Sequence, residues 1–198
     1  QFVTKILPKQ PQKNKSTVES ILKNVQKNGD SAVKKYEKKF TGASLSTLRI
    51  SKAEIKNAYS KVSKNEITAL RFAKTRVEKT ESTINNIFKN KKINHDGIHI
   101  IKNFIPIQSA GCYIPGGLAR YPSSVIMSVI PAKVAGVKRI VVVSPPKSNG
   151  KIDPLTIVAA DICGATEIYK TGGVQAIGAL SYGTKSISKV DKIVGPGG

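Results

Sequence analysis

Residues 111–124 read GCYIPGGLARYPSS, a stretch rich in glycine, proline and serine. It lies between an apolar segment typical of a strand and an apolar segment typical of a helix. A glycine-rich turn lets a ligand approach the backbone closely, because no side chain stands in the way. The first turn of a following helix offers unpaired N–H groups to an anion. We therefore take this stretch as the centre of a candidate ligand site.

The residues around and after this turn alternate between strand and helix. We expect strands at residues 108–114, 139–144, 167–170 and 190–194, and helices at residues 125–135, 153–163 and 171–180. Apolar runs without alternation, such as RIVVVS at 139–144, are typical of buried parallel strands. The intervening helices predict right-handed crossovers. Ser123 or Ser124 should cap the first helix, and Pro131 should kink or split it.

Glycine-rich turns follow three of these strands, with the sequences IPGG at 114–117, TGG at 171–173 and GPG at 195–197. Ligands of parallel sheets bind beyond the carboxyl ends of the strands. We therefore expect the three turns to line one edge of the sheet and to bind a nucleotide-like or phosphate-bearing ligand. The sequence has neither the G-x-G-x-x-G fingerprint nor a Walker lysine motif, so the site would be an atypical one.

The first half of the chain is lysine-rich and predicts helices. The capping-box pattern Ser-x-x-Glu predicts three helix starts, at Ser16–Glu19, Ser51–Glu54 and Ser63–Glu66. We expect the helix after the third box to reach about Lys89. Asp96-Gly97 between β-branched residues predicts a hairpin turn. His95 and His99 flank that turn without a carboxylate cluster, so we assign them to the strands and expect no metal site there.

Together these patterns predict an α/β fold in two parts. Residues 1–107 form an N-terminal helical region with a β-hairpin, and residues 108–198 form a truncated, incomplete Rossmann-like parallel sheet with flanking helices. Cys112 and Cys163 fall on apolar elements without metal-ligand spacing, so we expect both in the core of a reduced, cytoplasmic protein. The sequence shows no apolar run of membrane-spanning length and no signal peptide, so we expect no membrane partner.

The net charge of +21 is concentrated in the first half. Residues 1–110 carry 23 basic and 8 acidic side chains, a net +15, and residues 111–198 carry 10 and 4, a net +6. Such an excess can bind nucleic acid or another polyanion. The lysines are spread over amphipathic helices, however, and no aromatic residues interleave with them as a stacking platform requires. We therefore interpret them as solvated helix faces and do not expect a nucleic-acid partner.

Several segments resemble histidinol dehydrogenases. Residues 111–146, 171–184 and 189–197 match three segments of that family in the same order and with similar spacing, and residues 28–40 resemble its N-terminal helical region. The resemblance implies an NAD-dependent enzyme of histidine biosynthesis, which oxidises L-histidinol through the aldehyde to L-histidine by two hydride transfers. It also implies a zinc ion that holds the substrate, and a homodimer.

The resemblance assigns cofactor contacts to Tyr113 and Gln175. Gly198 stands where the family has a third contact, an asparagine, so the cofactor site is altered there. From the residues alone, Tyr113 could equally be a packed aromatic at a strand end, and Gln175 a helix-start residue capping its turn. Arg120 could meet an acidic group of a ligand or simply solvate the turn, and it stays unassigned.

Family members are much longer than this chain, and the resemblance places their zinc ligands and the Glu-His pair for acid–base chemistry in a second half. We therefore assign no catalytic and no metal-binding residue here, and we expect this chain to be inactive alone. The alternative is a freestanding basic protein that binds a nucleotide or polyanion and kept the fold without the chemistry.

Overall fold

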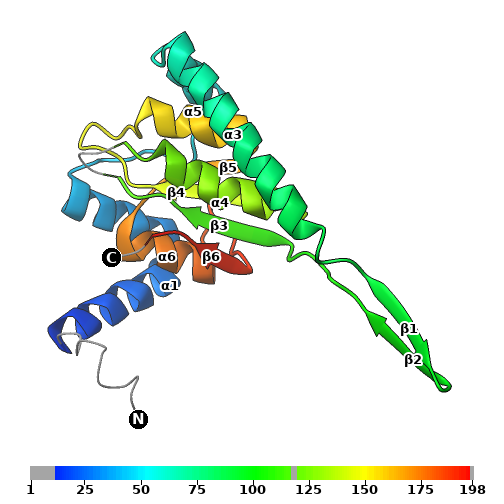
Figure 1. Cartoon of the computed structure of the whole chain (residues 1–198). Helices are drawn as coiled ribbons and strands as arrows, with labels where there is room; N and C mark the ends of the chain where they lie inside the picture. Colours follow the sequence, from blue (N-terminus) through cyan, green and yellow to red (C-terminus); the bar gives the residue numbers. More distant parts are fainter. Residues whose placement is uncertain (1–11, 117–119, 197–198) are drawn as a thin grey trace.

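Four parallel strands form the sheet around which the chain folds (Figure 1). The computed structural model describes residues 12–116 and 120–196, with the backbone alone at residues 12–14. Its elements are α1 (Gln12–Thr41), α2 (Lys52–Tyr59), α3 (Lys64–Asn85), β1 (Lys91–His95), β2 (Ile98–Lys102), β3 (Ser109–Tyr113), α4 (Pro122–Val134), β4 (Arg139–Ser144), α5 (Pro154–Cys163), β5 (Glu167–Lys170), α6 (Gly173–Tyr182) and β6 (Lys192–Val194). None of the helices in these ranges is long and apolar enough to cross a membrane.

The sheet has the strand order β5-β4-β3-β6 and is covered by helices on both faces. Ile140 and Val142 of β4 pack in one cluster with residues of α2, α3, α4 and α5. Val141 and Val143, on the opposite face, pack with residues of α1 and α6. Parallel strands buried on both faces are expected to be continuously apolar, as β4 is. The predicted α/β fold, with helices, a hairpin and a parallel sheet, is therefore confirmed.

Both cysteines lie in the cluster formed with α2 to α5. Cys112 of β3 and Cys163 of α5 are fully buried. Burial raises the pKa of the Cys112 thiol to about 12 and that of Cys163 to about 11, so both stay protonated and behave as small apolar residues. Their predicted place in the core is confirmed.

Two of the three predicted capping boxes are present. Ser51 and Ser63 each accept a hydrogen bond from the N3 backbone N–H, and the carboxylate of each N3 glutamate accepts one from the N-cap backbone N–H. The prediction at Ser16 is wrong, because α1 already begins at Gln12 and no proline or glycine at residues 12–15 stops it. Gly29, with φ 53°, instead divides α1 in two. The third helix, α3, ends before its predicted end.

The start of α4 also differs from the prediction. Its N-cap is Tyr121, which makes no side-chain capping bond, and Pro122 takes the first helical position. Proline fits there because its missing N–H would be unpaired anyway. Ser123 and Ser124 therefore lie inside the helix and are not caps. Pro131 lies in the interior of α4, which runs as one helix from Pro122 to Val134, and its carbonyl accepts a hydrogen bond of 2.9 Å from the Ala135 N–H at the helix end.

The hairpin of β1 and β2 extends away from the sheet as an arm (Figure 1). His95 pairs with Ile98 across a two-residue turn, in which Asp96 has φ 47° and Gly97 has φ 81°. Two positive φ angles are what the favoured hairpin turn requires, so the prediction is confirmed. Both strands are exposed along their whole length. The Nδ1 atom of His99 lies 2.7 Å from the Oδ1 atom of Asn94.

Candidate functional site

The carboxyl ends of β3, β4, β5 and β6 lie along one edge of the sheet, because all four strands are parallel. The described parts of the three glycine-rich turns, residues 114–116, 171–173 and 195–196, follow β3, β5 and β6 directly. Chain segments that are far apart in the sequence are thus brought to one place. This is the edge at which parallel sheets bind ligands.

Pro145 packs against two of these turns. It follows β4, the strand between β3 and β5, and lies against both Gly116 and Gly172. A Cβ atom added at Gly116 would lie 2.5 Å from the Pro145 Cγ atom, and one added at Gly172 would overlap the Pro145 Cβ atom. Neither glycine can therefore carry a side chain while the proline is present.

Tyr113 connects the turn after β5 to the end of β3. It is the last residue of β3 and is partly exposed. Its hydroxyl accepts a hydrogen bond of 3.1 Å from the backbone N–H of Gly173. A Cβ atom at Gly195, where φ is 138°, would overlap the Tyr113 carbonyl oxygen. The turn after β6 is thus held tightly against the same residue, and Tyr113 lies where three of the strand ends meet.

Glu37 is a buried carboxylate that sequence reasoning missed. It lies in α1, has no exposed surface, and its Oε1 atom accepts three hydrogen bonds. The donors are the Thr171 hydroxyl at 2.9 Å, the Gly172 N–H at 2.9 Å and the Gln175 Nε2 atom at 2.8 Å. A signal existed in the sequence, since Glu37 is the single acid in KKYEKK and follows Val33 by four residues, on the buried face of the helix.

The side chain of Gln175 is bound by this carboxylate. Its side chain is 2% exposed, and its Nε2 atom donates to Glu37. Within the described residues, the Gln175 Oε1 atom and the Glu37 Oε2 atom have no hydrogen-bond partner. A buried polar atom without a partner costs about 1–3 kcal/mol. The turn thus contains two buried acceptors that are not matched by a protein donor, and such groups concentrate at functional sites.

The first N–H groups at the start of α6 are already bound. Gly172 donates to Glu37 and Gly173 donates to the Tyr113 hydroxyl. A helix N-terminus binds phosphate through such N–H groups when they are free. Here the protein occupies them and places a carboxylate behind them. At Gly172 and Gly173, groups of the protein thus take the N–H groups that a phosphate would otherwise bind.

Arg120 is engaged by two carboxylates rather than pointing free at the edge. Its Nη1 atom lies 2.9 Å from Glu66 of α3, and its Nε atom lies 3.2 Å from Asp153, the N-cap of α5. Lys170, at the end of β5, is likewise paired with Glu54 at 2.9 Å. The edge is thus less positive than its sequence suggests. Gly198, the third predicted cofactor contact, lies outside the described residues.

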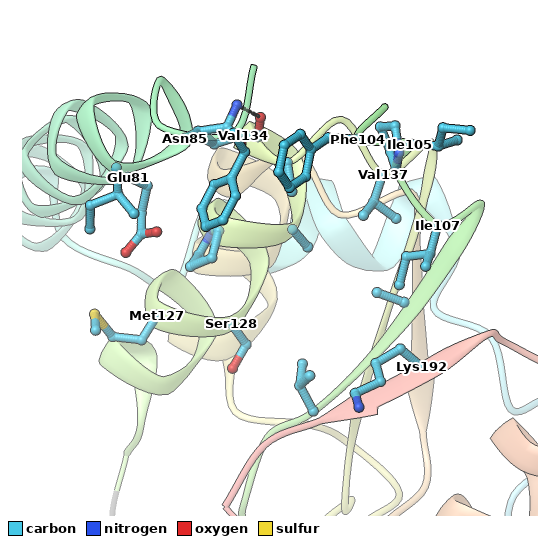
Figure 2. Close-up of a pocket in the computed structure, with 18 of the residues that line it drawn as sticks. Glu81, Asn85, Phe104, Ile105, Ile107, Met127, Ser128, Val134, Val137 and Lys192 are labelled. Carbon is cyan, nitrogen blue, oxygen red and sulfur yellow. Dashed lines mark hydrogen bonds between the residues drawn. The ribbon is translucent and has the colours of Figure 1, made fainter. Parts of the chain in front are cut away.

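An apolar hollow of about 780 Å³ lies between α3, α4, the segment at residues 104–107 and β6, and Gly195 of the turn after β6 also lines it (Figure 2). Phe88 and Phe104 line it and contact each other edge-on, with ring centroids 5.3 Å apart. Ile105 and Met127 also line it and are largely exposed. Within the described part of the chain, no group of three or more His, Cys, Asp and Glu residues could hold a metal ion.

Comparisons with known proteins agree on one family. The family model for histidinol dehydrogenase matches residues 7–198. Histidinol dehydrogenase of Methanococcus maripaludis is 49% identical over 181 residues, which are 91% of this chain and 42% of the relative. That of Clostridium acetobutylicum is 47% identical over 182 residues, with the same two shares. The chain thus spans less than half the length of these curated relatives.

A solved structure gives the same result in three dimensions. The crystal structure of histidinol dehydrogenase from Elizabethkingia anophelis has a TM-score of 0.90 and 36% sequence identity. The similarity covers 98% of this chain and 44% of that one. It therefore includes the sheet, its helices and the glycine turns described above. On sequence and on structure alike, the chain belongs to the histidinol dehydrogenase family.

Proposed function

We propose that this chain is the nucleotide-binding, amino-terminal part of an oxidoreductase that oxidises L-histidinol to L-histidine in histidine biosynthesis, with NAD as the cofactor. Residues 108–198 would form the nucleotide-binding domain, and residues 1–107 the helical and hairpin region that supports it. The observation that carries the proposal is the meeting of three glycine turns at Tyr113, on the carboxyl edge of a parallel sheet.

The residues at this edge suit a cofactor held by neutral polar groups. The Tyr113 hydroxyl accepts its bond from Gly173, so its own hydrogen can donate to a ligand. The unmatched Oε1 atom of Gln175 can accept from a ligand. When bound, NAD would supply the hydride acceptor for both oxidations, of the alcohol to the aldehyde and, after addition of water, of the aldehyde to the acid.

The remaining chemistry is proposed to come from outside this chain. The described residues offer no site for the zinc ion, and we assign no catalytic residue among them. We propose that the zinc ligands and the acid–base pair belong to sequence beyond these 198 residues, in a cytoplasmic homodimer. This chain would then contribute Tyr113 and Gln175 to the cofactor site. It would also contribute Gly198, at the position where the family has a cofactor-contacting asparagine.

The proposal is tested by titrating the 198-residue chain with NAD+ in a calorimeter. We expect saturable binding with a Kd below about 1 mM. Tyr113→Phe should weaken it about fivefold, the equivalent of about 1 kcal/mol for one hydrogen bond. Tyr182→Phe, at the exposed end of α6, is the matched control and should leave the Kd unchanged. No binding by the parent chain would contradict the proposal.

Two further measurements separate the alternatives. With L-histidinol, Zn²⁺ and NAD+ added, the chain alone should produce no NADH, and measurable turnover would contradict the incomplete site. The basic surface of the first half favours the alternative of a polyanion-binding protein. Salt-sensitive binding to nucleic acid, much tighter than the micromolar range of non-specific binding, would support that alternative instead.

A further inference from the structure

We infer that Glu37 is a positioning residue for the cofactor site, because its carboxylate turns the Gln175 amide so that only the carbonyl oxygen is left for the nucleotide. The group that meets Gln175 is then a neutral hydrogen-bond donor and not a phosphate. The inference rests on the proposed function. It adds Glu37 to the cofactor site, and it states that Gln175 accepts a hydrogen bond from the cofactor.

The orientation of the Gln175 amide follows from chemistry. An ionised carboxylate only accepts hydrogen bonds, and of the two ends of an amide only the NH₂ group donates. The amide must therefore face Glu37 with its Nε2 atom, which lies 2.8 Å from Oε1. The reverse orientation would place two acceptors against each other. The Oε1 atom of Gln175 is consequently the free end, and it has no partner among the described residues.

The free oxygen lies beneath a glycine. A Cβ atom added at Gly173 would lie 3.0 Å from the Gln175 Oε1 atom, so on this side no side chain lies over the buried oxygen. Gly173 has φ 56°, a backbone conformation that other residues rarely adopt. A small movement of this turn would expose the acceptor to a ligand at the sheet edge.

The surroundings select against a phosphate. The N–H groups of Gly172 and Gly173 are occupied by Glu37 and Tyr113, and the Glu37 carboxylate carries a negative charge behind the turn. An anion at the Gln175 Oε1 atom would meet this charge and a second acceptor, and neither of them can donate a hydrogen bond to it. A nicotinamide adenine dinucleotide has three kinds of neutral donor: the ribose hydroxyls, the N–H groups of the nicotinamide carboxamide and the amino group of adenine.

The test uses four variants of the 198-residue chain. Glu37→Gln keeps the shape and one acceptor but removes the charge, and Glu37→Ala removes all three hydrogen bonds. Thr171→Val removes one bond to Glu37 while the Gln175 amide stays held. Glu19→Gln removes the same charge from an exposed position of α1 and serves as the control. The measurements are the Kd for NAD+, the Tm, and hydrogen exchange of the Gln175 side-chain amide by NMR.

We expect the Gln175 amide to be protected from exchange in the parent chain and in Thr171→Val, and to exchange freely in Glu37→Ala. Glu37→Gln should weaken NAD+ binding about five- to tenfold, as the loss of one or two charge-assisted contacts does, with the Tm nearly unchanged. Thr171→Val and Glu19→Gln should bind NAD+ like the parent. If affinity falls in proportion to Tm in all variants, Glu37 is merely structural and the inference is overturned.

Ligand probes test the polarity of the contact. NAD+ should shift the Gly173 and Gln175 amide resonances, and inorganic pyrophosphate should not. An equal effect of pyrophosphate would overturn the inference. With 3-acetylpyridine adenine dinucleotide, which has no amide N–H, weaker binding would identify the carboxamide as the donor. Unchanged binding would point to a ribose hydroxyl or the adenine amino group. A protected Gln175 amide in a parent chain that does not bind NAD+ would contradict the proposed function while leaving the positioning by Glu37 intact.

Discussion

Glu167, the first residue of β5, binds two side chains at the amino end of the sheet. Arg139 donates to it through Nε at 2.7 Å and through Nη2 at 3.0 Å, and the Tyr169 hydroxyl donates at 2.7 Å. The hydrogen bond from Arg139 lowers the pKa of Glu167, and Tyr169 adds to this against the opposing effect of burial. Burial and the nearby carboxylate raise the pKa of Tyr169 to about 12.

We predict that the stabilising effect of Glu167 depends on pH. A carboxyl whose pKa is lower in the folded state stabilises the fold above its unfolded pKa, and the effect is lost as pH falls through the folded pKa. Glu167→Gln should therefore lower the free energy of unfolding by about 2 kcal/mol at pH 7. The difference from the parent should shrink below about pH 4.3, the usual pKa of glutamate.

Urea unfolding at pH 7, 5 and 3.5 measures this difference. Glu19→Gln, exposed on α1, is the control and should change the free energy of unfolding little at any of these pH values. A cost of Glu167→Gln that stays constant down to pH 3.5 would mean that packing, and not charge, makes the contribution.

At the scale of elements, the helix starts differ in how they are capped. Ser63 begins α3 with a reciprocal capping box, whereas Ser123 lies within α4, which starts at a proline. We predict that Ser63→Ala lowers the free energy of unfolding by about 1 kcal/mol, because an N-cap bond is lost. Ser123→Ala should change it by no more than about 0.5 kcal/mol, as exposed substitutions usually do. Chemical denaturation of both variants decides this, and equal costs would contradict the assignment of Tyr121 as the N-cap.

The elements that the sequence predicted well depend on local signals. β4 and β5 have the predicted bounds. For β4 the reason is an apolar run between breakers, which determines a buried strand. The hairpin turn and the boxes at Ser51 and Ser63 are likewise complete within a few residues. The box at Ser16 failed because the same pattern also fits inside a helix that nothing stops upstream. Glu37 was missed because its partners lie more than 130 residues away in the sequence.

The candidate site was predicted only in part, because some of its contacts join residues that are far apart in the sequence. The meeting of the turns at one edge follows from the parallel topology, which the strand–helix alternation already predicted. The topology does not predict which hydrogen-bond donors and acceptors at that edge are already bound within the protein. The bonds of Gly172 and Gly173 depend on tertiary contacts with α1 and β3, and these contacts decide which N–H groups of the turn are left for a ligand.

At the scale of the whole molecule, the apolar hollow between α3, α4 and residues 104–107 leaves large side chains open to solvent (Figure 2). We predict that it binds the dye 8-anilinonaphthalene-1-sulfonate with an increase in fluorescence, since apolar concave surfaces do so. Ile105→Ser should reduce this binding several-fold without lowering the Tm, because Ile105 is 79% exposed in the native protein.

Ile98→Ser is the matched control, since Ile98 is 60% exposed on the hairpin, outside the hollow. It should leave the fluorescence unchanged. Equal losses in the two variants would place the dye on the arm, and no fluorescence from the parent chain would contradict the prediction altogether.

The contact of Pro145 with Gly116 and Gly172 also has an evolutionary consequence. The three positions share one small volume, so the space available to each depends on the other two. A larger residue at 116 needs a smaller residue in place of the proline ring. A larger residue at 172 needs a glycine at 145, because its Cβ atom would overlap the Cβ atom of any other residue there. The order of substitutions is then constrained, because the step that enlarges a glycine first passes through an overpacked, destabilised intermediate. As relatives diverge, these three sites should change together or not at all.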